Sequence, residues 1–411
     1  MTIRMDSLVK TIATALDIVE GELLGASTHH GKRIAVLCAA MGKALGMGGE
    51  ELLGLTICAL LHDNALTEYI LSEREGERRD AAMKLHCEYG QRNVNALHFK
   101  ADVRNFVLYH HEWADGSGPF GIQAGDGPLG AELIAIADSL DVAHHLQRQE
   151  PEGLSRIRAI IAEKTGTQYS KQASAVMLEI LDWPMLLSLK DEVILKTATQ
   201  AIPPWLVDTE EQTSFGLASF ITRIIDYKSV FTRRHSTQIA NKAWYMGGRY
   251  GYTETERAEL YLAAALHDIG KLATPVAILE KPGKLTNEEF LIIKEHVRIT
   301  WEILKDIEGF ETICAWASNH HEKLDGTGYP FGKKAEELDF NSRLLACIDI
   351  YQAVSEERPY HPGRNHGDTI KILYDMAEKG QVDSGIVKDI DAALTPFNGG
   401  DLPAPAQTAC F

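Results

Sequence analysis

The sequence contains one pattern of histidine and aspartate residues twice, and this repeat limits the fold more than any other feature. Each copy has a first histidine, a His-Asp pair whose histidine lies 32 positions later, a third histidine, a His-His-Glu triplet that begins 24 positions after it, and a final aspartate. The metal-ligand types of the first copy are His30, His62, Asp63, His86, His110, His111 and Asp138. Those of the second copy are His235, His267, Asp268, His296, His320, His321 and Asp349. Such a repeat indicates a duplicated structural unit.

Apolar residues recur at intervals of three and four between these positions, which is the spacing of amphipathic helices. Residues 6–24 show this spacing, and the apolar run 260–266 leads directly into His267. We therefore predict an all-α fold of two tandem helical domains that arose by internal duplication.

The join between the domains is expected near Pro203 and Pro204, because two successive prolines stop a helix. The predicted domains are residues 1–203 and residues 204–395. Residues 396–411, rich in proline and glycine, are expected to form a loose C-terminal tail.

The composition excludes several classes of protein. The formal net charge is −17, from 41 basic and 58 acidic side chains, whereas binding to a nucleic-acid polymer needs a basic surface. No apolar run reaches the roughly 18 residues of a membrane-spanning helix. The first 25 residues carry acidic side chains and Lys10, where a signal peptide would be apolar. We therefore expect a cytoplasmic protein that binds neither a nucleic-acid polymer nor a membrane.

The repeated residues are of the types that bind metal ions. An adjacent histidine and aspartate place a nitrogen ligand beside a carboxylate, which suits two neighbouring cations, whereas the six cysteines show no CxxC spacing and indicate no thiolate site. A glycine-rich turn after the second triplet can bring backbone close to a bound anion. The pattern indicates a metal-dependent phosphohydrolase. Five histidines outside the two sets are expected to lie at the surface: His29, His98, His144, His145 and His366.

These motifs resemble the HD-GYP family, the branch of the HD phosphohydrolase superfamily that cleaves cyclic dinucleotides. The second copy carries the likeness almost throughout, with Lys271 three positions after Asp268, a Gly-Tyr-Pro loop at 328–330, and Arg358 in an Arg-Pro-Tyr string. The first copy has Leu66 in place of the lysine. The resemblance implies two tandem HD-type domains in a bacterial signalling enzyme, similar to phosphodiesterases that act on cyclic di-GMP or 3′,3′-cyclic GMP-AMP.

The resemblance also implies how the second copy works. Its seven metal-type residues would hold two divalent transition metal ions; iron or manganese is favoured, and nickel or zinc also suits the ligands. Asp268 would bridge the ions, and a hydroxide held between them would attack phosphorus. Lys271, the second catalytic residue, would neutralise charge on the phosphoryl oxygens. The other predicted contacts to substrate are Arg358, Tyr329 and Gly328.

Two positions of the second copy depart from the family pattern. Phe231 stands where the family often has a glutamate that binds a third metal, so we expect two metals and a linear dinucleotide as the main product. Gln352 stands where an aspartate is often found, three positions after Asp349.

The first copy is expected to differ in function. It keeps the metal-type residues, yet Leu66 cannot neutralise a phosphate, and its loop at Gly118-Pro119 has no tyrosine. We predict a domain that binds metal, turns over slowly or not at all, contacts the catalytic domain, and supports or regulates it. The Gly-Tyr-Pro loop of the second copy is a predicted contact for a protein partner.

Two other functions stay open at this point. One is a regulatory protein that binds a cyclic dinucleotide without turnover, and Lys271 with the Gly-Tyr-Pro loop counts against it. The other is an HD phosphohydrolase that acts on another nucleotide, and the same loop with Arg358 counts against that.

Overall fold

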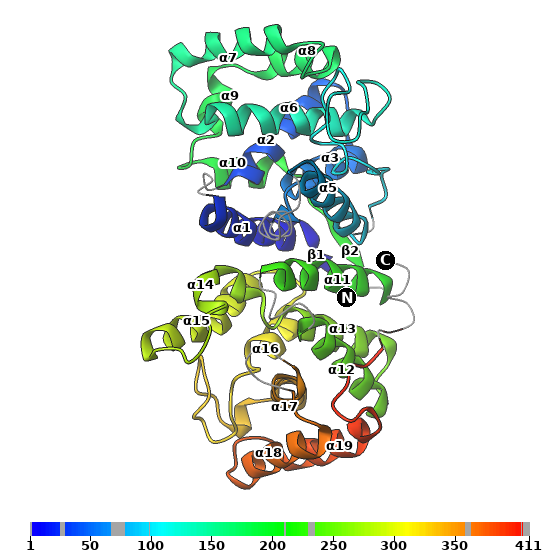
Figure 1. The fold of residues 1–411 in the computed structure, drawn as a ribbon, viewed down its shortest axis with the longest axis vertical. Helices are drawn as coiled ribbons and strands as arrows, with labels where there is room; N and C mark the ends of the chain where they lie inside the picture. The colour runs from blue at the N-terminus through cyan, green and yellow to red at the C-terminus, as the bar shows by residue number, and fades with distance from the viewer. Residues whose placement is uncertain are drawn as a thin grey trace. The chain divides into compact units, whose positions relative to one another are not determined.

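Helices are the main elements of the part of the chain that the structure describes, as Figure 1 shows. The computed structural model describes residues 2–24, 29–66, 79–97, 99–208, 211–228, 235–357, 363–403 and 405. Within these residues the strands are β1 (Thr2–Arg4) and β2 (Leu206–Asp208), which pair with each other. The predicted all-α fold is therefore confirmed. None of the helices in the described ranges is long and apolar enough to cross a membrane.

Two compact units make up the chain. The N-terminal unit is Met5–Leu206, and the C-terminal unit is Val207–Phe411 together with Met1–Arg4.

The N-terminal unit is built around α2, which packs against α3, α6, α8 and α10. A long amphipathic helix, α1, covers the range in which the sequence shows apolar spacing. The helices are α1 (Met5–Leu24), α2 (His30–Ala44), α3 (Gly49–Leu60), α5 (Arg79–Asn95), α6 (Leu129–His144), η1 (Leu146–Arg148), α7 (Pro151–Lys164), α8 (Lys171–Ile180), α9 (Trp183–Ser188) and α10 (Ile194–Ala201).

The C-terminal unit repeats this arrangement, with α12 packed against α13 and α17. Its helices are α11 (Glu211–Lys228), α12 (His235–Arg249), α13 (Glu254–Leu266), η2 (Ile269–Ala273), α14 (Val276–Leu279), α15 (Asn287–Leu304), α16 (Glu311–Ser318), η3 (Ala335–Glu337), α17 (Phe340–Ser355), α18 (His366–Glu378), α19 (Ser384–Leu394) and η4 (Thr395–Phe397).

Helix α13 forms the centre of the C-terminal unit and delivers the His-Asp pair. It begins at a capping box in which Thr253 and Glu256 satisfy each other's backbone N–H groups. From Leu260 to Leu266 every residue is buried, as expected for a helix that is apolar on all sides. Because the run ends inside the unit, His267 and Asp268 follow it at a buried position, and each is 1% exposed.

Two residues near the C-terminal end are more buried than the sequence suggested. Leu402, within the expected tail, is 3% exposed, and its backbone N–H donates to Gln238 Oε1 at 2.9 Å. The expectation of a surface position for His366 was wrong: it is 6% exposed, and its ring nitrogens bond to the Tyr351 hydroxyl and to Asp391. Hydrogen bonds at both nitrogens satisfy this ring inside the core.

We predict that Thr286→Ala lowers the free energy of unfolding by about 1 kcal/mol. Thr286 caps α15, the helix that carries His296, by accepting the Glu289 N–H at 3.2 Å. The matched control is Thr255→Ala, an exposed position within α13 that does not cap it. Denaturant titration of the two variants checks the prediction, and equal stabilities would contradict it.

Candidate metal centre

Five elements of the C-terminal unit bring the predicted ligands to one point. His235 is the first residue of α12, His267 follows α13, and His296 lies on the buried face of α15. His320 follows α16, and Asp349 lies on the buried face of α17. The groups that can hold a metal ion are His235 with His267 and Asp268, and His296 with His320 and His321.

Backbone carbonyls fix the orientation of three of these imidazoles. The Nδ1 atoms of His267, His296 and His320 bond to the carbonyl oxygens of the residues three positions earlier, at 2.6, 2.5 and 2.6 Å. An Nδ1–H that donates to a carbonyl leaves Nε2 with its lone pair. The Nε2 atoms of His296 and His320 lie 3.4 Å apart, and that of His267 has no hydrogen-bond partner among the described residues. The lone pairs therefore converge as metal ligands require.

Asp268 lies between the two groups of histidines. Its Oδ2 is 3.1 Å from His267 Nε2 and 3.9 Å from His235 Nε2, and its Oδ1 is 3.2 Å from His296 Nε2. One carboxylate thus faces both groups, so it could bind an ion held by either of them. Lys271 Nζ is 2.5 Å from Asp268 Oδ2, so the predicted catalytic lysine reaches the same point.

Asp349 closes the other side of the centre. Its Oδ1 is 3.3 Å from His235 Nε2, and its Oδ2 is 3.6 Å from His321 Nδ1. Burial opposes ionisation of Asp268, but the charges of His267 and Lys271 outweigh it and hold the Asp268 pKa well below its usual range. Burial lowers the pKa of His321 to about 4, which keeps that ring neutral. Carboxylate oxygens and imidazole nitrogens together are the ligand types that suit divalent transition metals.

The loop after the triplet is held by a residue to which sequence reasoning gave no role. Glu322 accepts the backbone N–H of Phe331 at 2.7 Å and that of Lys333 at 3.0 Å. The Tyr329 ring lies 4.9 Å from the His321 ring, so the Gly-Tyr-Pro tip sits beside the centre. Gly328 cannot carry a side chain, because a Cβ there would lie 2.5 Å from Glu322 Cα. The recurrence of glutamate in both triplets was the signal for this anchor.

The N-terminal unit builds the same centre from the first set of residues. Asp63 Oδ1 is 3.1 Å from His86 Nε2, and its Oδ2 is 3.4 Å from His62 Nε2. Asp63 therefore also faces two groups that can hold an ion, one with His30 and His62, the other with His86, His110 and His111. The second carboxylate of this centre is Asp138, whose Oδ1 is 3.2 Å from His30 Nε2.

The two units orient their first histidine differently. In the N-terminal unit, Asp141 accepts from His30 Nδ1 at 2.7 Å and is itself held by Arg33 at 2.9 Å. In the C-terminal unit the position of Asp141 is Gln352, and Glu356, four positions further, accepts from His235 Nδ1 at 2.9 Å. Hydrogen bonds to both Asp349 and Glu356 overcome the effect of burial and raise the pKa of His235 to about 9. The sequence held no spacing that singled out Glu356.

Three predicted positions lie outside the described residues. These are Arg358, a predicted substrate contact, Phe231, the departure at the third-metal position, and His98, one of the histidines expected at the surface.

We predict that Glu356→Ala lowers the affinity of the C-terminal centre for manganese about 10- to 100-fold, because residues that orient a metal-ligating histidine contribute on this scale. Glu357→Ala, a change at the neighbouring exposed glutamate, is the matched control. Equilibrium dialysis with manganese measures both. Equal affinities would show that Glu356 does not orient His235.

Comparison with known proteins gives consistent matches. A family model described as "HD domain" matches residues 17–169 and, separately, residues 219–386. The 3'3'-cGAMP-specific phosphodiesterase 1 of Vibrio cholerae is 27% identical over 390 residues, which is 91% of this chain and 88% of that protein. The cyclic di-GMP phosphodiesterase response regulator RpfG of Xanthomonas campestris is 32% identical over 166 residues, which is 40% of this chain and 43% of that protein.

A solved structure supports the same fold. The cyclic GMP-AMP-specific phosphodiesterase V-cGAP3 of V. cholerae superposes with a TM-score of 0.62 at 22% identity, over 96% of this chain and 98% of that one. The two ranges matched by the family model cover more than half of the sequence and contain both histidine–aspartate centres. The chain therefore belongs to the HD domain family.

Proposed function

We propose that the protein is a metal-dependent phosphodiesterase that hydrolyses a cyclic dinucleotide, with its catalytic centre in the C-terminal unit. The observation that carries the proposal is the position of Asp268, whose two oxygens face separate groups of histidines. When bound, two divalent ions would activate a water molecule and withdraw charge from the phosphate. Iron and manganese are the preferred candidates for these ions.

The residues of the C-terminal unit have distinct proposed roles. The seven metal-type residues hold the ions, and Lys271, 20% exposed at its side chain, offers a cation to the phosphoryl oxygens. Tyr329 and Gly328 shape the wall beside His321, where the substrate would enter. Arg358 is proposed to bind the second phosphate of the substrate through its guanidinium group.

The proposed substrate is 3′,3′-cyclic GMP-AMP rather than cyclic di-GMP. The support is the extent of the similarity: the V. cholerae relative named for cyclic GMP-AMP matches along 91% of this chain, and the X. campestris relative named for cyclic di-GMP along 40%. Rates measured with both dinucleotides and with guanosine tetraphosphate, in added manganese or iron, test this. Faster turnover of cyclic di-GMP would overturn the preference, and turnover of guanosine tetraphosphate alone would overturn the substrate class.

We predict that Asp268→Ala abolishes turnover and removes most of the metal from the C-terminal centre, because the bridging carboxylate is lost. Lys271→Met is expected to lower the rate at least 100-fold while the metal is retained, because that lysine is not a proposed ligand. Elemental analysis and the rate of linear dinucleotide formation distinguish the two variants. A near-normal rate in Asp268→Ala would refute the two-metal centre.

We predict that the linear dinucleotide is the main product. Phe231 offers no carboxylate for a third ion, and the first cleavage releases a far more flexible molecule that fits the centre less well. Chromatography of an early time course checks this prediction. Mononucleotide that forms with no linear intermediate would contradict it.

A supporting role is proposed for the N-terminal unit. Its seven residues offer the same kinds of ligands, and the Nε2 atoms of His62 and His110 are buried with no hydrogen-bond partner in the described ranges. Leu66 replaces the catalytic lysine, so turnover there is expected to be slow or absent. Metal bound at this centre would stabilise the N-terminal unit, and Asp63→Ala in the full chain tests this through its metal content and melting temperature.

A further inference from the structure

The two units differ beside the second histidine of the triplet. In the C-terminal unit the Tyr329 ring covers His321, and Lys294 Nζ lies 4.8 Å from the centre of that tyrosine ring. The N-terminal loop is one residue shorter and passes directly from Gly118 to Pro119. Lys84, which matches Lys294, lies instead over Phe120, at 5.6 Å. The side chain that fills the space beside His321 therefore has no equivalent beside His111.

A groove lies beside His111 in the N-terminal unit. It has a volume of about 490 Å³ and is lined by Met83, Lys84, His111, Trp113, Ser117, Gly118 and Pro119. Its volume falls within the range of about 300–1,000 Å³ that is usual for small-molecule sites. His111 connects the groove with the metal-type residues, because it also lines a smaller cavity of about 40 Å³ with His110 and Asp138.

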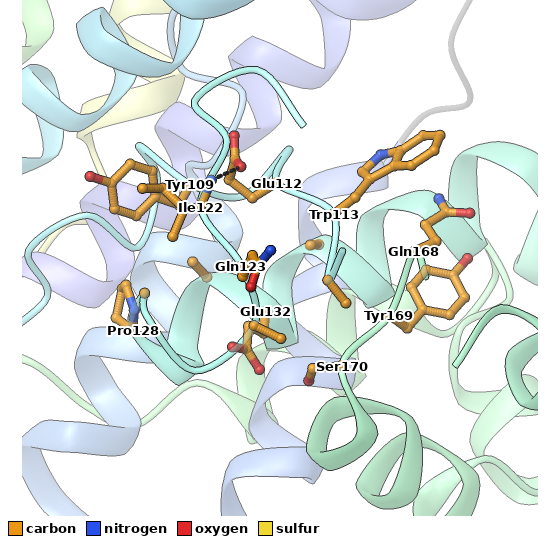
Figure 2. A pocket seen from close by; sticks show the side chains of 15 residues that line it. Tyr109, Glu112, Trp113, Ile122, Gln123, Pro128, Glu132, Gln168, Tyr169 and Ser170 are labelled. Atoms are coloured by element: carbon orange, nitrogen blue, oxygen red, sulfur yellow. Dashed lines mark hydrogen bonds between the residues drawn. The ribbon is translucent and has the colours of Figure 1, made fainter. Parts of the chain in front are cut away.

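Trp113 supplies a flat apolar wall to this groove. Its side chain is 47% exposed, and it lines both cavities that reach His111. Figure 2 shows the Trp113 indole on the same side of the adjoining pocket as Gln168 and Tyr169, away from Tyr109 and Ile122. The backbone N–H of Ala114 donates to the Gln168 carbonyl at 3.2 Å, which fixes the chain next to the indole. The matching residue in the C-terminal unit is Lys323, which has no ring.

The lining of the groove also offers positive charge. Lys84 is exposed, and it lies on α5 two positions before the ligand-type residue His86. A flat aromatic surface, together with a cation and a metal-type centre in the same groove, suits a nucleotide base and a phosphate. Glu112 holds the loop that carries Ser117 and Pro119 by accepting the N–H groups of Phe120 and Ile122. These two hydrogen bonds fix the loop side of the groove without a ligand.

We propose that the N-terminal unit is a receptor site for a purine cyclic dinucleotide, with a base stacked on Trp113 and a phosphate directed to Lys84 and His111, and that it holds this ligand without hydrolysing it. The class of nucleotide rests on the proposed function of the C-terminal unit. Retention without cleavage follows from Leu66, which offers no cation at the position of Lys271. The open space left by the missing tyrosine accommodates the base.

The test uses the full chain carrying Asp268→Ala, loaded with manganese and titrated with 3′,3′-cyclic GMP-AMP and with cyclic di-GMP. Equilibrium dialysis gives both the stoichiometry and the affinity, for every variant. We expect about one equivalent of nucleotide to bind. Trp113→Ala and Lys84→Glu, both at exposed side chains, should each weaken binding about 10-fold or more. Trp113→Phe keeps a ring for stacking and should retain most of the affinity.

The matched control is Leu195→Ala, which removes another exposed apolar side chain of the same unit, on α10 and outside the groove lining; binding should not change. Absence of bound nucleotide, or equal affinities in Trp113→Ala and Leu195→Ala, would overturn the receptor site. Turnover by the unmodified chain is measured separately. A chain that turns over substrate but fails these binding tests loses only the receptor site. A chain that binds at Trp113 without turnover loses only the proposed activity.

Discussion

A buried carboxylate surrounded by imidazoles is the interaction on which each unit depends. Asp268 is 1% exposed, and its nearest polar neighbours are His267, His296 and Lys271. A carboxylate taken out of water at this depth is costly unless cations or hydrogen-bond donors surround it. Helices from distant parts of the sequence therefore have to meet at this atom group. The same buried carboxylate therefore determines both which helices pack together and which ligands the centre offers.

The two units pack the turn after the His-Asp pair in different but equivalent ways. In the C-terminal unit, a Cβ at Gly270 would run into the His296 carbonyl, and the Thr300 hydroxyl accepts the Gly270 N–H at 3.1 Å. In the N-terminal unit, Ala65 matches Gly270 and Gly90 matches Thr300. The glycine therefore lies on the helix and not in the turn. Asn64 replaces the threonine hydroxyl by donating to the Gly90 carbonyl at 3.1 Å. The first copy therefore lacks the lysine, but the turn after its His-Asp pair still packs against the helix that carries its third histidine.

Sequence spacing could predict the all-α fold and the residues that meet, because each ligand lies at a fixed place on a helix or just after its end. It could not predict Glu356 as the support of His235. That contact depends on where the end of α17 lies in relation to α12, which is a property of tertiary packing. His366 shows the same limit: its polar side chain suggested the surface, but Tyr351 and Asp391 provide partners inside the core. The groove beside His111 was not predicted either: the sequence shows that the tyrosine is missing, but not that the space beside His111 stays open.

The glutamate of each triplet has a consequence for how the two centres diverge. Glu322 grips its loop at Phe331 and Lys333, and Glu112 grips the shorter loop at Phe120 and Ile122. The tip lies outside the gripped positions, between the triplet and the first of them. Residues can be inserted or deleted there while the histidines keep their places. The loop tip, and with it the ligand preference, can therefore change in one copy alone. A duplicated chain can in this way acquire two pockets of different shape beside the same set of histidines and aspartates.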